Sequence, residues 1–145
     1  MSFLFKKICI ASDHAGYNLK NEILDYLINK NISIVDLGPP NDNSVDYPDY
    51  AKKVSRRIMS GKSEIGILVC GSGTGMSITA NKMKGIRAAV CYNLKSTRLS
   101  RQHNDANIIS LGSRLLKKKD ALNFVSLFLR TKFEGGRHLK RIKKI

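Results

Sequence analysis

The sequence predicts an α/β fold, a three-layer αβα sandwich built on a five-stranded parallel sheet. Short apolar runs alternate with segments whose apolar residues recur every three to four positions, as they do in amphipathic helices. The run at 65–70, IGILVC, is apolar on both faces, which is typical of a strand covered by helices on both sides. Right-handed crossovers between such strands give a doubly wound sheet of the Rossmann-like type.

Five apolar runs are the predicted strands, and the helical patterns lie between them. We expect strands at residues 7–12, 32–38, 65–70, 86–91 and 107–112. We expect helices from the spacing of Leu19, Ile23 and Leu27, from that of Tyr50, Val54 and Ile58, and over 76–83 and 121–129. No repeat or linker divides the chain, so residues 1–145 are expected to form a single domain.

The three cysteines, Cys9, Cys70 and Cys91, are too few and too scattered for a disulfide framework or a zinc site. Cys9 and Cys91 belong to apolar strand-like runs, and we interpret both as small core residues. No apolar run approaches the roughly 20 residues that cross a bilayer, and no secretory signal is recognisable at the start. A cytoplasmic location without membrane association is therefore expected.

The net charge of +15 is the main compositional anomaly. Residues 114–145 hold 11 Lys and Arg against two acids, so this segment carries +9 of the total. A basic tail can bind nucleic acid, phosphorylated metabolites or another subunit. The sequence favours Lys, Asn and Ile throughout, so compositional drift is a competing explanation of the charge, and nucleic acid is a remote alternative as a partner.

The predicted sheet directs attention to the residues that follow its strands, because ligands of such sheets bind beyond the carboxyl ends of the strands. Asp13 and His14 follow the first strand, and Cys70 begins the loop CGSGTG after the third. The glycines allow close backbone approach to a ligand, and free N–H groups at the next helix favour an anion. The loop lacks the P-loop and GxGxxG patterns. Cys70 is therefore either a reactive thiolate or a buried structural thiol.

Six segments in fixed order carry a resemblance that covers nearly the whole chain: SDHAGYNLK at 12–20, DYPDYA at 46–51, CGSGTGMSITANK at 70–82, GIRAAVC at 85–91, SRQHNDANIISLGSR at 100–114 and FEGGRHLKRI at 133–142. Together they resemble the ribose-5-phosphate isomerase B family, which also includes galactose-6-phosphate and allose-6-phosphate isomerases. The resemblance implies interconversion of D-ribose 5-phosphate and D-ribulose 5-phosphate, a step of the pentose phosphate pathway. It further implies a homodimer, which could pair into a tetramer, with no metal and no organic cofactor.

The resemblance also implies roles for individual residues. Cys70 matches the carbon base, and no acid at 74–76 can replace it. The Ser72 hydroxyl and the backbone N–H groups of Gly71, Gly73 and Gly75 would stabilise an enediolate. His103 matches the group that opens the sugar ring, and Asn104, Asp13 and Tyr47 would contact the sugar.

The phosphate requires forked or positively charged donors. His14, Arg114, Arg137 and Arg141 match the phosphate-site positions of the family, and His138 lies between the last two. In the family, His103 and the C-terminal arginines face the cysteine of the partner subunit. A hexose 6-phosphate substrate, allose or galactose 6-phosphate, is the main alternative to the pentose.

Overall fold

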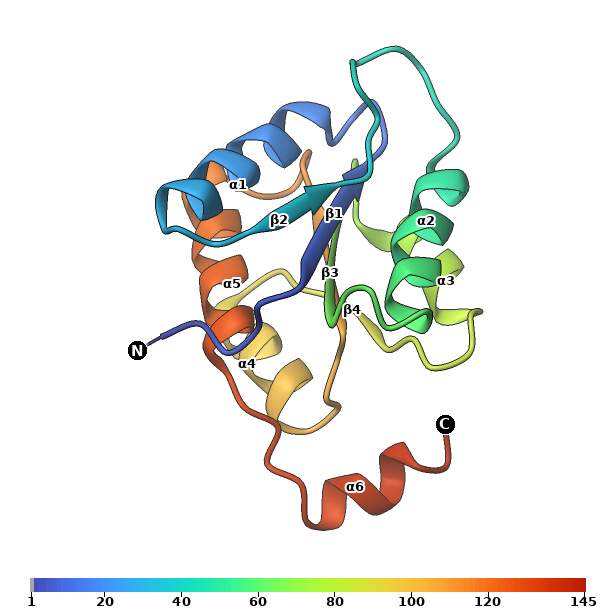
Figure 1. Ribbon diagram of the computed structural model, residues 1–145, viewed down its shortest axis with the longest axis vertical. Coiled ribbons are helices and arrows are strands. Elements are labelled where there is room, and N and C mark those ends of the chain that lie inside the picture. The colour runs from blue at the N-terminus through green and yellow to red at the C-terminus, as the bar shows by residue number, and fades with distance from the viewer. Residues whose placement is uncertain (1) are drawn as a thin grey trace.

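The computed structural model describes residues 2–145 and confirms the predicted α/β sandwich. Five strands form one all-parallel sheet in the order β2-β1-β3-β5-β4 (Figure 1). The strands are β1 (Ile8–Ser12), β2 (Ile34–Asp36), β3 (Ile65–Cys70), β4 (Ala88–Val90) and β5 (Ile108–Gly112). The helices are α1 (Tyr17–Asn29), α2 (Tyr47–Met59), α3 (Thr74–Asn81), α4 (Leu94–Gln102), α5 (Lys118–Arg130) and α6 (Arg137–Ile142).

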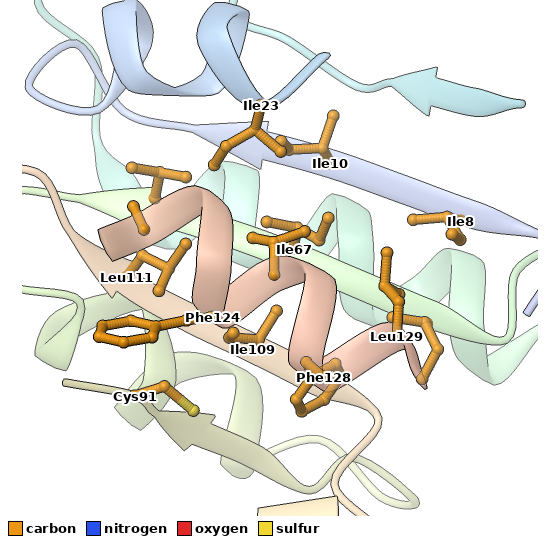
Figure 2. Close-up of a cluster of buried hydrophobic side chains, with 14 of the residues drawn as sticks. Ile8, Ile10, Ile23, Ile67, Cys91, Ile109, Leu111, Phe124, Phe128 and Leu129 are labelled. Atoms are coloured by element: carbon orange, nitrogen blue, oxygen red, sulfur yellow. The ribbon is translucent and has the colours of Figure 1, made fainter. Parts of the chain in front are cut away.

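Two hydrophobic clusters, one on each face of the sheet, hold the helices in place. Alternate residues of β1 enter different clusters, since Ile8 and Ile10 join one and Cys9 and Ala11 the other. Figure 2 shows the first cluster, in which Phe124 and Phe128 of α5 lie over strand residues of β3 and β5. The second cluster packs α2 and α3 against the opposite face. Each fully buried aliphatic or aromatic side chain contributes roughly 1.5–3 kcal/mol to stability.

The two edge strands are shorter than the sequence predicts. Strand β2 spans Ile34–Asp36 rather than 32–38, and β4 spans Ala88–Val90 rather than 86–91. Each edge strand has only one neighbour in the sheet, so regular pairing stops earlier than the apolar pattern does. The central strands β1, β3 and β5 are buried along their whole length.

Apolar spacing did not predict two of the helices, α4 and the short α6, and α4 shows the reason. Its buried residues are Thr97, Ser100 and Arg101, so it presents no apolar stripe. A capping box defines its start, because the Asn93 side chain accepts a hydrogen bond from the Ser96 backbone N–H at 2.7 Å.

Cys9 and Cys91 are buried free thiols, as predicted. Burial raises the pKa of both thiols, because the charged thiolate is poorly solvated there. Neither is suited to chemistry near neutral pH. Among residues 2–145, no helix is long and apolar enough to cross a membrane.

The two ends of the sheet carry different sets of predicted site residues. The carboxyl ends of β1, β3 and β5 lead to Asp13, to the loop after Cys70 and to Arg114. The connection from α4 to β5 lies at the amino ends of the strands and contains His103 and Asn104. Helix α6 lies beyond that same end, far from the tip of the β1 arrow (Figure 1).

Candidate active site

Cys70 ends β3 opposite Gly112 of β5 and is 4% exposed. Its Sγ accepts a hydrogen bond from the Gly73 backbone N–H at 3.1 Å. Gly73 has a left-handed conformation, with φ of 79°, and immediately precedes α3. This conformation turns the N–H back toward the sulfur and suits a glycine. The N–H donor and the start of α3 both favour negative charge on the sulfur.

A cleft of about 520 Å³ lies at this end of the sheet and includes Cys70. Four connections of the fold contribute to it, so residues distant in sequence meet around the thiol. Its lining comprises Asp13, Tyr47, Cys70, Gly71, Ser72, Thr74, Gly75, Ile78, Arg114 and Leu115. The volume is in the range of small-molecule sites.

Asp13 lines the cleft but is not the N-cap residue that its position before a helix suggests. Its Oδ1 accepts a hydrogen bond from the Gly16 backbone N–H at 3.0 Å, and Gly16 itself is the N-cap of α1. The Asp13 carboxylate therefore closes the turn before the helix. The Asp13 backbone N–H donates to the Val69 carbonyl at 3.1 Å, which fixes the residue beside the end of β3.

Tyr47 and Arg114 pack closely against the glycine loop. The Tyr47 ring lies over Gly75, and a Cβ at Gly75 would come within 2.6 Å of a ring carbon. Any larger side chain at 75 would displace the ring. The Arg114 guanidinium lies beside Gly71, with Nη1 3.0 Å from the place of a Cβ. Arg114 is exposed and carries its charge into the cleft.

His14 is half-buried and does not line the cleft itself. Its Nδ1 accepts a hydrogen bond from the Val45 backbone N–H at 3.2 Å. With Nδ1 acting as acceptor, Nε2 carries the proton in the neutral ring and can donate to a ligand. The same bond ties the loop before α2, and hence Tyr47, to the end of β1.

The remaining predicted residues line a second hollow, of about 470 Å³, at the amino ends of the strands. It is formed by His103, Asn104, Arg137, His138, Arg141, Ile142 and Ile145. The rings of His103 and His138 stack with centroids 4.2 Å apart. Partial desolvation lowers the pKa of His138, and the neighbouring His103 and Arg137 lower it further.

The structure thus divides the predicted site between two places. Asp13, Tyr47, Cys70, Ser72 and Arg114 share one cleft together with Gly71 and Gly75. His103, Asn104, Arg137 and Arg141 share the other hollow. Within one chain, the two groups lie at opposite ends of the sheet (Figure 1).

The sequence analysis did not identify two buried charged residues, Lys20 and Arg101. Lys20, 1% exposed, donates from Nζ to both carboxylate oxygens of Asp36 at 2.9 and 3.0 Å and to the Pro39 carbonyl at 2.9 Å. The sequence does indicate burial of Lys20, because it stands three residues before Ile23 on the apolar stripe of α1. A cation in that stripe requires a partner, and Asp36 ends the neighbouring strand β2.

Arg101 holds the end of α4 from the inside. It donates from Nη1 to the Ala106 carbonyl at 2.7 Å and to Asp105 Oδ1 at 2.9 Å, and from Nε to the Thr131 carbonyl at 3.1 Å. Burial lowers the pKa of Arg101, while Asp105 opposes that shift. These bonds fix the position of the segment that carries His103.

Comparison with known proteins identifies the class of this fold and site. The family model described as Ribose/Galactose Isomerase matches residues 8–145. The chain therefore belongs to the ribose/galactose isomerase family, as the motifs predicted.

Within this family, the chain is similar to proteins named ribose-5-phosphate isomerase B. The chain is 43% identical to ribose-5-phosphate isomerase B of Escherichia coli over 97% of its length and 94% of that protein. A solved ribose-5-phosphate isomerase B from Clostridium thermocellum superposes with a TM-score of 0.93 at 50% identity, covering 94% of this chain and 93% of that one. The ribose-5-phosphate isomerase B of Mycoplasma genitalium, solved with bound ribulose-5-phosphate, superposes with a TM-score of 0.90 at 43% identity. The match covers 94% of this chain and 91% of that one.

Proposed function

We propose that this chain is an aldose–ketose isomerase that interconverts D-ribose 5-phosphate and D-ribulose 5-phosphate, with Cys70 as the carbon base. The observation that carries this assignment is the placement of Cys70, whose sulfur accepts the Gly73 N–H inside a cleft that also holds Asp13 and Arg114. Membership of the isomerase family and the relative solved with bound ribulose-5-phosphate support the substrate.

The proposed chemistry is a proton transfer between neighbouring carbons. The Cys70 thiolate removes the proton from C2 of the open-chain aldose, and the electron pair of the C–H bond moves into an enediolate. A proton moves from the C2 hydroxyl to the O1 oxygen, and the Cys70 thiol returns its proton to C1 as the C2 carbonyl forms, which yields the ketose. The Ser72 hydroxyl and the N–H groups of Gly71 and Gly75 are donors for the negative oxygen, whereas the predicted donor Gly73 does not line the cleft and its N–H is bonded to Cys70 Sγ. Asp13 contacts the hydroxyls near the reacting carbons.

The ring-opening group must come from elsewhere, because His103 lies at the other end of the same chain. We propose a homodimer in which the His103 hollow of one chain faces the Cys70 cleft of its partner. A two-fold axis that places the two chains antiparallel creates two such composite sites. Exposed apolar side chains at this end of the sheet support a protein contact there. Ile78 and Leu115 line the cleft, Tyr92 and Leu94 follow β4, and all four are 50% to 72% exposed. Pairing of dimers into a tetramer is compatible with this arrangement.

The phosphate is assigned to a set of basic groups drawn from both chains. Arg114 and the Nε2 of His14 lie on the Cys70 side, and Arg137 and Arg141 come from the partner together with His103 and Asn104. Arg137 and Arg141 stand four residues apart in α6, so they share a face of that helix. This assignment gives part of the basic C-terminal segment a defined task.

The same proposal covers the organisation and setting of the protein. Residues 1–145 act as one sugar-phosphate isomerase domain, and the chemistry requires no cofactor because proton transfer between carbons consumes none. We place the protein in the cytoplasm, where three free thiols are maintained in the reduced state.

An isomerase assay on two substrates tests the proposal. The purified protein should convert ribose 5-phosphate with kcat on the order of 1–10³ s⁻¹ and act on allose 6-phosphate at least about tenfold more slowly in kcat/KM. A Cys70→Ala preparation purified in parallel controls for isomerase carried over from the host. Conversion of the hexose phosphate without conversion of the pentose phosphate would overturn the substrate assignment.

A further inference from the structure

Three metal-binding side chains converge beside the second hollow, and nothing in the isomerase chemistry uses them as a set. We propose that His103, Glu134 and His138 form a binding site for a divalent transition-metal ion such as Zn²⁺, and that occupation of this site inhibits the enzyme. The ion would be an inhibitor that takes His103 out of use, and would not be a cofactor. Binding itself follows from the cluster, whereas inhibition rests on the proposed function.

The spacing of the donor atoms is close to that of a metal site. Glu134 Oε1 lies 3.7 Å from His103 Nε2 and 3.6 Å from His138 Nε2. All three ligand atoms lie within 4.8 Å of one another. Ligand atoms around a tetrahedral zinc ion, with bonds of 2.0–2.2 Å, are roughly 3.3–3.6 Å apart. The two rings are stacked at an interplanar angle of 13°, so the partly exposed His103 ring must tilt out of the stack to aim both lone pairs at one ion.

The donors are held in place by backbone contacts and remain available. The Glu134 N–H donates to the Gln102 carbonyl at 3.0 Å, which joins the Glu134 segment to the end of α4. Among residues 2–145, the rings of His103 and His138 and the carboxylate of Glu134 have no side-chain contacts of hydrogen-bond or ion-pair type except those with one another.

The donor set selects the class of metal. Two imidazoles and one carboxylate, with a fourth position open to water, match the pattern of open zinc sites. Imidazole nitrogen favours Zn²⁺ and Cu²⁺ over Mg²⁺ and Ca²⁺, which prefer all-oxygen ligands. Arg137 and Arg141 border the same hollow and repel a cation. Both are exposed, so water and salt screen that repulsion but do not remove it.

We assign ring opening to Nε2 of His103, the nitrogen that lies 3.7 Å from Glu134 Oε1 in the hollow. While Nε2 is bound to a metal, it cannot exchange a proton with the sugar. Substrate phosphate and the ion would also compete for the hollow, since phosphate needs Arg137 and Arg141 accessible. Inhibition should therefore weaken as the substrate concentration rises and disappear when a chelator is added.

Direct binding of Zn²⁺ to the purified full chain, measured by competition with a chromophoric chelator, tests the site without any assay of isomerisation. We expect one Zn²⁺ per chain, at least about tenfold weaker binding in Glu134→Gln and in His138→Gln, and unchanged binding in Glu22→Gln. Arg141→Gln should tighten binding by about two- to fivefold, because it removes a repelling charge. Cys70→Ala should bind like the wild type, which separates this site from a thiolate site.

Two results would overturn the metal site: wild-type binding in both Glu134→Gln and His138→Gln, or loss of binding in Cys70→Ala. Glu134 is exposed and glutamine is isosteric with it, so Glu134→Gln leaves the core intact and a loss of binding reports on the site itself. If Zn²⁺ binds as described but leaves turnover of ribose 5-phosphate unaffected, the inhibitory role is wrong while the site stands. An absence of isomerase activity in the metal-free wild type would instead contradict the proposed function.

Discussion

Cys70→Ala lowers kcat for ribose 5-phosphate by about two to four orders of magnitude, the usual contribution of a positioned proton-transfer group. The variant retains Asp13, Arg114 and the N–H groups of the glycine loop, so substrate still binds and KM changes little. No acid stands at 74–76 to take over the proton. The measurement is steady-state kinetics, with thermal unfolding of the same preparation to establish that the fold persists.

Cys91→Ala is the matched control, because it removes an equally buried thiol at the end of β4, away from the cleft. It should retain most of the wild-type kcat at a modest cost in stability. If Cys70→Ala and Cys91→Ala show the same kcat, Cys70 is a structural thiol and the carbon base must be sought elsewhere in the cleft.

Lys20→Met lowers the free energy of unfolding by about 2–4 kcal/mol, because it removes the partner of a buried charge contact. Methionine preserves the apolar stem of lysine but offers no donor to Asp36 or to the Pro39 carbonyl. Asp36 is 39% exposed and recovers part of its solvation, which keeps the loss below that of a fully buried pair. Urea unfolding followed by circular dichroism measures the difference.

Lys52→Met is the control for Lys20→Met, since Lys52 is exposed on α2 and should change stability by no more than about 0.5 kcal/mol. Lys20 also anchors the loop that leads to Tyr47, so its variant should show a raised KM. Equal unfolding free energies for the two variants would show that the Lys20–Asp36 contact contributes nothing net.

The fold could be predicted in detail wherever apolar residues decide the structure. Strands β1, β3 and β5 pack on both faces, so their sequences are almost continuously apolar and their predicted bounds agree with the structure within one residue. Helix α4 could not be predicted in this way, because it is held by polar contacts of Thr97 and Arg101 rather than by an apolar stripe. Such contacts depend on tertiary neighbours that local spacing does not reveal.

The site was predicted only as a set of residues. The rule that ligands bind at the carboxyl ends of strands selected Asp13, His14 and Cys70, of which Asp13 and Cys70 line the cleft and His14 does not. The same rule gives no reason to choose His103, which follows a helix and lies at the opposite end of the sheet. His103 entered through its motif alone. The contact of Lys20 with Asp36 links two elements and is visible only in three dimensions.

The central claim is that Cys70 of one chain works with His103 of another, and mixing two inactive variants tests it directly. Cys70→Ala and His103→Ala should each be nearly inactive as homodimers. After unfolding and refolding together in equal amounts, half of the dimers carry both variants. Each mixed dimer has one intact site out of two, so the mixture should recover about a quarter of wild-type activity.

Each variant unfolded and refolded alone is the control and should stay inactive. Recovery of about a quarter of wild-type activity in the mixture supports a site shared between chains. A mixture no more active than the refolded single variants, with size measurements showing that mixed dimers formed, would contradict the shared site and place Cys70 and His103 in separate functions.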